Sequence, residues 1–367
     1  MTIRHYGWPS SPFSAKTRAY LKAVDADFQD IQPHAFTLYR KIKPAIGYVM
    51  MPTVELSDGR FLQDSSRIID YFEALPSTPT IVPGTPKQRL ASALLEVYAD
   101  EWLPLIAMCT RWTIPDNRRF AQSDFGRCAF PWLPSLLSRR FAKPMAKKMS
   151  SYLPVLGITD HTTPKILAWL KSLTGQLNEH FGNFPYLFGA RPSLADFSLA
   201  APLFAHVWRD PGSRQYIEDN PDLLRWMHAV QDGPSLTGSF SEDDHVAETL
   251  LPILRHQREV QFPVLRETFR RVHAKVSASD FDGKLPRSLG TAEISIGGAT
   301  AHRRVLVMNQ WKAQRIFDTL ASFTPTDHDK TLEWAETSLG YSNELKEPPA
   351  TRVEYQGYRL GVERIEP

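Results

Sequence analysis

Thiols are scarce in this chain, which has only Cys109 and Cys128 among its 367 residues. Two isolated cysteines exclude a scaffold held together by disulfides. No Cys/His cluster has the spacing of a metal site, so we expect no bound metal. The same scarcity is typical of a reduced compartment, and we predict a cytoplasmic location.

The sequence also lacks long apolar runs and a strong excess of either charge. No run approaches the roughly 18 residues that a membrane span needs, and residues 1–5 lack the apolar core of a signal peptide. We therefore expect a soluble protein with no integral membrane segment. The net charge of +3 is too small to predict a nucleic-acid-binding protein.

Prolines, by contrast, are numerous, and the 29 present predict many breaks between helices. Hydrophobic residues make up 42% of the chain, enough for a sizeable core spread over about two or three domains. We find no internal repeat and no low-complexity tract.

The first 80 residues alternate short strands with helices. The pattern predicts strands at 3–6, 28–32, within 50–56 and at 61–63, and helices at 12–24 and from 65 onward. Ser11 and Pro12 are typical of the N-cap and first position of a helix. We expect an irregular connection between residue 32 and Pro52, and a hairpin turn at 57–60.

Ser11-Pro12-Phe13-Ser14 places two hydroxyls at the junction of the first strand and helix. Two cysteines there could exchange disulfides, because the helix N-terminus lowers a thiol pKa and the second thiol resolves the intermediate. Serine can do neither, which argues against a thiol-disulfide reductase. A serine hydroxyl can donate a hydrogen bond to an external thiolate, so the motif indicates a thiol cofactor.

Together with Met51-Pro52 before the hairpin and Asp64-Ser65 at a helix start, this order resembles the thioredoxin-fold domain of the glutathione transferase superfamily. The resemblance implies an α+β fold with a thioredoxin-like βαβ-ββα domain at 1–80. It also implies an all-helical domain at 86–240, which leaves 241–367 as an α/β-hairpin extension of unknown role.

The resemblance also implies where glutathione binds. The Met51–Pro52 bond would be cis and the Met51 backbone would pair with the cysteinyl part, while Ser65 and the helix N-terminus would hold the γ-glutamyl carboxylate. Asp64 would face the amino group of the ligand. Asp64 is one methylene shorter than the usual glutamate, and two extra residues precede Pro52.

Three residues compete for contact with the thiol. Ser11 is our first choice, with Ser14 and Tyr6 as alternatives. We expect Trp8, Phe13 and Trp112 to form the wall for the second substrate.

The helical part contains Gly189–Phe197, which matches the start of the core helix of the family. Ser193 and Asp196 have the spacing of a capping box, so we assign them a structural role. An insertion at 113–157 interleaves basic and aromatic residues, among them Trp132 and Phe141. We interpret it as a helical elaboration with a solvated basic face. A membrane-surface or nucleic-acid patch, or a wall for a bulky apolar substrate, are the alternatives.

The extension carries no catalytic motif that we recognise. Its pattern predicts a helix at 246–276, a hairpin at 293–296 and 303–308 around Gly297-Gly298, a helix capped by Asn309, and a last strand within 353–362.

The function that the resemblance implies is a glutathione-dependent transferase of the conjugating, lyase or isomerase type. Glutathione would be the cosubstrate and a small hydrophobic electrophile the partner, with no nucleic acid bound and a homodimer as the family's common state. The alternative is a non-catalytic protein of the same fold that binds a ligand or another protein.

Overall fold

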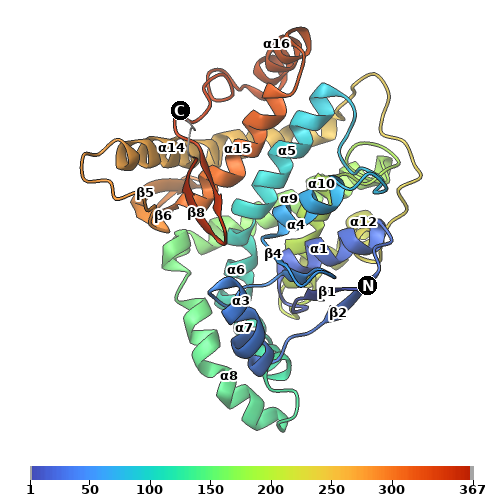
Figure 1. The fold of residues 1–367 in the computed structure, drawn as a ribbon. Coiled ribbons are helices and arrows are strands. Elements are labelled where there is room, and N and C mark those ends of the chain that lie inside the picture. Colours follow the sequence, from blue (N-terminus) through green and yellow to red (C-terminus); the bar gives the residue numbers. More distant parts are fainter. Residues whose placement is uncertain (1, 364–367) are drawn as a thin grey trace.

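The computed structural model describes residues 2–363 and has the mixed α+β fold expected from the sequence (Figure 1). A four-stranded sheet of order β2-β1-β3-β4 forms the N-terminal part. Strands β1 and β2 are parallel, and β3 is antiparallel to both β1 and β4. The elements are β1 Ile3–Tyr6, α1 Pro12–Ala23, β2 Phe28–Ile31, β3 Thr53–Glu55, β4 Phe61–Gln63 and α4 Ser65–Glu73.

Helix α1 begins as its sequence predicts. The Ser11 hydroxyl accepts a hydrogen bond from the Ser14 N–H at 3.2 Å, and Pro12 occupies the first turn. Ala15, Ala19 and Tyr20 lie on its buried side. The helix therefore packs between the sheet and the helical part of the chain.

The connection between β2 and β3 differs from the expected irregular segment. It contains α2 Ala35–Thr37, a π-helical turn at Leu38–Ile42 and α3 Lys43–Ile46. Leu38, Ile42 and Ile46 are buried at four-residue spacing, so tertiary burial stabilises a helix despite Pro44. Gly47 ends it with a φ of 85°, which glycine adopts without steric cost.

Helices make up the middle of the chain. Proline occupies the first turn of several of them, where the missing N–H costs no hydrogen bond. The helices are α5 Pro86–Glu101, α6 Pro104–Thr113, α7 Pro115–Ala129, α8 Ser135–Ser150, α9 Thr163–Asn183, α10 Leu194–Pro202, α11 Gln215–Glu218 and α12 Pro221–Gln231.

Helix α10 is the buried centre of this part, and every residue in it is buried. The capping box predicted at its start is present: the Asp196 carboxylate accepts hydrogen bonds from the Ser193 N–H and hydroxyl at 2.8 and 2.7 Å. It also accepts from the Leu187 N–H and the Trp226 indole. Asp196 is thus a structural residue that joins three segments.

The C-terminal part combines helices with two hairpins, and three of its details correct the sequence expectations. Gln261 separates two helices where one was expected. Asn309 lies inside a helix and donates to Glu101, so it is not a cap. The expected last strand is a hairpin turned at Gly357. The elements are α13 Leu251–Val260, α14 Phe262–Val276, β5 Ser288–Ile296, β6 Ala299–Leu306, α15 Val307–Ala321, α16 Pro325–Trp334, β7 Val353–Gln356 and β8 Arg359–Val362.

The C-terminal part packs directly on the other two. Helix α15 lies along α5, and the β7–β8 hairpin lies beside α15 (Figure 1). Leu56, Leu94, Leu254 and Ile316 belong to one continuous buried cluster. All three parts therefore share a single hydrophobic core.

Candidate active site

The sheet register brings the predicted site segments to one edge. Tyr6 is paired with Thr53, and Thr53 with Gln63, so these three residues lie in one row across the strands. The chain continues past this row into the loop before Ser11, into Pro52 and into Asp64. Residues far apart in sequence thus meet at the same edge of the sheet.

Ser11 and Ser14 differ in what their hydroxyls can do. Ser11 is half-buried, and its oxygen accepts from the Ser14 N–H. Its hydroxyl donates to no other residue within 2–363, so the proton is available to a ligand. Ser14 is fully buried, and its hydroxyl has no partner among residues 2–363. A Cβ on Gly7 would lie 2.7 Å from the Ser14 oxygen, so Ser14 faces the β1 end. Ser11 is the better placed of the two for an external ligand.

Tyr6 points to the other face of the sheet. Its neighbour His5 contacts Thr17 of α1 at 2.7 Å, and successive strand residues face opposite sides. The Tyr6 hydroxyl donates to Glu55 at 2.7 Å, and burial raises the pKa of this phenol. The structure does not bring Tyr6 together with Ser11.

Met51 and Pro52 are joined by a cis peptide bond, the form that the family resemblance implies. Pro52 is buried and Met51 is half-buried. The main-chain N–H and C=O of Met51 make no hydrogen bond to other residues within 2–363. This short stretch can therefore pair with an extended ligand backbone.

The start of α4 combines a helix N-terminus with an unpartnered hydroxyl. Asp64 caps the helix by accepting from the Ser66 N–H at 2.9 Å. Ser65 is 2% exposed, and its buried hydroxyl has no partner in the part of the chain that the structure describes. The helix dipole and this hydroxyl together suit a carboxylate.

Lys312 of α15 already contacts this position. Its Nζ lies 3.2 Å from the Asp64 carboxylate, 2.6 Å from the Ser66 hydroxyl and 2.9 Å from Asp100. Burial by itself would lower the pKa of Lys312, but the surrounding carboxylates raise it, so the ammonium is charged. A side-chain ammonium thus occupies the place that the resemblance assigns to the amino group of glutathione.

A buried charge network holds α15 against the site. Lys16 of α1 donates to Glu96 and Asp100 of α5, at 3.0 and 2.8 Å. Arg315 of α15 bonds the same Glu96 at 2.9 Å and pairs with Asp70 of α4. The network therefore connects all three parts of the chain beneath the α4 N-terminus.

A second network fixes the loop that carries Ser11. Arg111 of α6 donates to the Ser10 carbonyl at 3.1 Å and forms a two-bond pair with Asp210 at 2.7 Å. Burial lowers the pKa of His206 well below its usual value, so its neutral ring donates to the Ala107 carbonyl and accepts from Arg111. The helical part thereby positions the β1–α1 loop.

Sequence reasoning missed both networks. Arg111 is the only charged residue in a mostly apolar helix, and this pattern could have predicted a buried partner for it. No such pattern singles out Lys312, because α15 is rich in polar side chains along its length.

Two of the three predicted wall residues meet in the core. The Trp8 and Trp112 rings pack on Phe125 at centroid distances of 5.7 and 5.9 Å, and both tryptophans are buried. Phe13 is half-buried in the first turn of α1. The two tryptophans are therefore part of the core beneath the site. Phe13 is more accessible to a ligand than either tryptophan.

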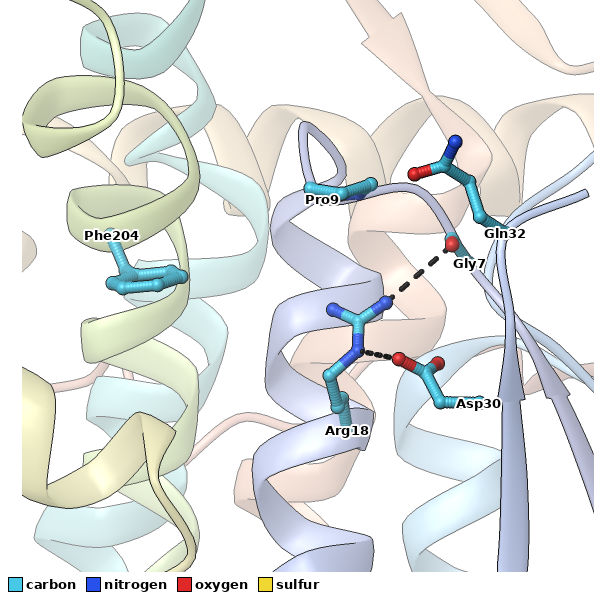
Figure 2. A pocket seen from close by; sticks show the side chains of 6 residues that line it. All are labelled: Gly7, Pro9, Arg18, Asp30, Gln32 and Phe204. Atoms are coloured by element: carbon cyan, nitrogen blue, oxygen red, sulfur yellow. Dashed lines mark hydrogen bonds and ion pairs between the residues drawn. The ribbon is translucent and has the colours of Figure 1, made fainter. Parts of the chain in front are cut away.

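A cavity of about 300 Å³ opens beside the β1–α1 loop (Figure 2). Arg18 projects between α1 and β2 there, bonding Asp30 at 2.6 Å and the Gly7 carbonyl. Phe204 lies on the opposite side. The cavity does not include Ser11, and a larger one of about 570 Å³ lies far from this edge, between Lys87 and α16.

Residues 2–363 contain neither a metal-binding cluster nor a membrane-spanning helix. No group of His, Cys, Asp or Glu side chains there could hold a metal ion. None of the helices in that range is long and apolar enough to span a membrane.

Comparisons with known proteins identify the first part of the chain. Residues 6–80 match the family described as Glutathione S-transferase, N-terminal domain. Curated protein sequences gave no significant match.

Three solved structures are among those that match about two thirds of the chain. A glutathione S-transferase from Rhodospirillum rubrum F11 is 17% identical, with 66% of this chain and 94% of that chain covered and a TM-score of 0.42. A beta-etherase from Sphingobium sp. strain SYK-6 is 20% identical, with 64% and 97% covered and a TM-score of 0.42. A glutathione S-transferase of Ceriporiopsis subvermispora in complex with glutathione is 15% identical, with 63% and 97% covered and a TM-score of 0.44.

The match over residues 6–80 agrees with the order of strands, the cis bond and the helix starts observed at this edge. Residues 6–80 are thus similar to the N-terminal domain of glutathione S-transferases.

Proposed function

We propose that the chain is a glutathione-dependent transferase of the conjugating, lyase or isomerase type, in which Ser11 stabilises the glutathione thiolate. One observation carries the proposal: Ser11 lies at the N-terminus of α1 with its hydroxyl proton free to donate, at the sheet edge shared with Met51 and Ser65. A cytoplasmic location and a homodimer remain predictions.

The chemistry requires only a shift in thiol ionisation. A free thiol has a pKa of about 8.5, so only a few per cent of glutathione is thiolate at neutral pH. A hydrogen bond from Ser11 and the dipole of α1 both favour the charged form. The thiolate then attacks the electrophilic carbon and the leaving group departs with the electron pair. Ser11 acts as a donor and not as a base, because its alkoxide is inaccessible.

The rest of the ligand would extend from Met51 to Ser65. The open main chain of Met51 suits the cysteinyl unit, and the unpartnered Ser65 hydroxyl at the α4 N-terminus suits the γ-glutamyl carboxylate. A hydrophobic electrophile would approach from the Phe13 side, above the buried Trp8 and Trp112.

The position of the charged Lys312 favours a second candidate function, that of a non-catalytic binding protein. Its ammonium pairs with Asp64, and Ser65 is almost fully covered, so the extension competes with the amino end of glutathione. A protein that never released this contact would be a non-catalytic member of the fold, binding a different ligand or a protein.

The first experiment measures the pH dependence of turnover with glutathione and an activated aryl halide. Ser11→Ala should move the rising limb to higher pH, because the bound thiol loses a donor to its charged form. Ser14→Ala and Tyr6→Phe are measured in parallel. An unchanged Ser11→Ala profile together with a shifted profile in either other variant would transfer the role to that residue.

The second experiment separates the two functions by titrating glutathione in a calorimeter. Lys312→Met should raise the affinity for glutathione roughly ten-fold, because it frees Asp64 for the ligand amino group. Lys171→Met, at an exposed position of α9, is the matched control. Absence of glutathione binding in both the natural chain and a folded Lys312→Met variant would favour the non-catalytic alternative.

A further inference from the structure

Helix α8 is an outlying element that the proposed transferase site does not use. It lies at the edge of the molecule beyond α7 (Figure 1). The helix packs on α7 through Ser138, Ala142 and Ala146, its buried residues. Most of its other residues are exposed, and their side chains define what can bind.

Large apolar side chains are exposed on and around α8. Leu136 is 73% exposed, and Trp132 and Phe141 are each 59% exposed. Across the domain boundary, Phe36 is 62% and Tyr39 is 58% exposed. We call these five residues, with Leu137, the α8 surface.

Ring contacts make this surface continuous. Phe141 contacts Phe130 at a centroid distance of 5.8 Å, Phe130 contacts Trp132 at 6.3 Å, and Trp132 contacts His34 at 5.2 Å. His34 in turn lies 6.4 Å from Phe36. The exposed rings of the sheet domain and of the helical domain therefore form one patch. Large exposed apolar patches usually mark interaction sites.

The two chain segments that carry the α8 surface contain basic residues and no acidic ones. No acidic residue occurs between Asp124 and Asp160, or between Asp30 and Glu55. Several basic side chains are exposed between Asp124 and Asp160. Between Asp30 and Glu55, Arg40 lies over the Phe36 ring and Lys43 over the Tyr39 ring. The basic residues exposed on α8 itself are Arg139, Arg140, Lys143, Lys147 and Lys148.

This combination fits an anionic lipid surface. Aromatic rings partition to the boundary between headgroups and acyl chains, and lysine and arginine bind acidic headgroups. Leu136 is the most exposed of the set. Its transfer from water into acyl chains is favourable, whereas it can neither pair with a phosphate nor stack on a base. The leucines therefore favour lipid over nucleic acid.

We propose that the α8 surface docks this protein on the face of an anionic membrane, with α8 lying in the plane of the interface. The rings and leucines enter the acyl boundary, and the basic side chains pair with headgroup phosphates. The chain remains peripheral, and the Ser11 edge keeps its access to water-soluble ligands.

The test is vesicle flotation with the full chain, comparing phosphatidylcholine vesicles with vesicles that also contain phosphatidylglycerol. The natural chain should float with the anionic vesicles only, and salt should weaken the binding. The triple variant Arg139→Gln, Arg140→Gln, Lys143→Gln should bind at least ten-fold more weakly. Trp132→Ser with Phe141→Ser should lose binding by a similar factor.

Control variants change exposed residues of the same chemical kind elsewhere. Lys171→Gln with Lys284→Gln removes exposed charge, and Leu75→Ser with Val82→Ser removes exposed apolar groups. Both pairs should bind as the natural chain does. All variants lie at the surface, and circular dichroism verifies their folding.

Three outcomes would overturn the proposal. One is equal or absent binding to the two kinds of vesicle. Another is binding of a single-stranded oligonucleotide, followed by fluorescence anisotropy, that the α8 variants abolish while vesicle binding is absent. The third is a dimer in light scattering that Trp132→Ser with Phe141→Ser dissociates, which would assign the surface to a second copy.

Discussion

At the scale of single residues, the site depends on buried side chains that bind no ligand themselves. Arg111 illustrates this, because one guanidinium satisfies the Asp210 carboxylate, the Ser10 carbonyl and the neutral His206 ring. Both members of the ion pair are buried, so each is tolerated only because the other is present. The loop bearing Ser11 is therefore fixed from the helical part and not from its own sequence.

Replacing Arg111 with methionine should destabilise the protein by about 3–5 kcal/mol, because the Asp210 carboxylate would stay buried without a counter-charge. Denaturant unfolding measures this change. The control is Arg270→Met, which removes an exposed pair with Glu267 and should change stability far less, because solvent screens that pair. The double variant Arg111→Met with Asp210→Leu should recover part of the loss. Equal, small effects at Arg111 and Arg270 would contradict the assignment.

At the scale of elements, small residues decide how closely helices pack. Gly126 of α7 faces the α8 backbone, and a Cβ there would lie 2.6 Å from the main-chain carbon of Ser138. Gly175 of α9 has no atom within 4 Å of the same position. A side chain at Gly126 would therefore collide with α8, whereas a side chain at Gly175 would meet no neighbour.

Alanine at these two glycines should change stability in opposite directions. Gly126→Ala should destabilise by about 1–3 kcal/mol, because α8 must move away from α7. Gly175→Ala should stabilise by up to about 1 kcal/mol, because alanine favours the helix and meets no neighbour. Thermal unfolding followed by circular dichroism tests both, and a stabilising Gly126→Ala would show that α8 is not closely packed.

At the scale of the whole molecule, buried histidines link stability to pH. His180 of α9 bonds the Thr249 hydroxyl at 2.7 Å and stacks on Phe184, and burial lowers its pKa to about 4. The unfolded chain binds a proton here below about pH 6.5, whereas the folded chain does so only near pH 4. Stability should therefore fall as the pH drops through this window.

Between about pH 6.5 and pH 4, protonation of His180 in the unfolded chain should lower the free energy of unfolding by roughly 3 kcal/mol. His180→Gln should flatten the acid limb of stability against pH, because glutamine does not titrate. His161→Gln, at an exposed position, should leave the slope unchanged. Urea unfolding at several pH values gives the slopes, and an acid limb unaltered by His180→Gln would contradict the prediction.

Local features were predictable wherever neighbours in sequence decide them. The Ser11 cap, the Ser193–Asp196 capping box and the Gly297-Gly298 turn each depend on residues within a few positions. The helical connection at 35–46 and the final hairpin were missed, because burial against distant elements overrides weak local preference there. Within the site, the helix starts could be predicted, whereas the orientation of each hydroxyl could not.

The sequence by itself determined the α+β organisation, the cluster of motifs in the first domain and their family resemblance, since hydrophobic periodicity, caps and turns are short-range signals. Only the tertiary structure decided what surrounds those motifs. Lys312 reaches Asp64 across 248 positions, and Arg111 reaches Asp210 across 99. Such pairs depend on how helices pack, because a buried charge needs a partner wherever the fold supplies one.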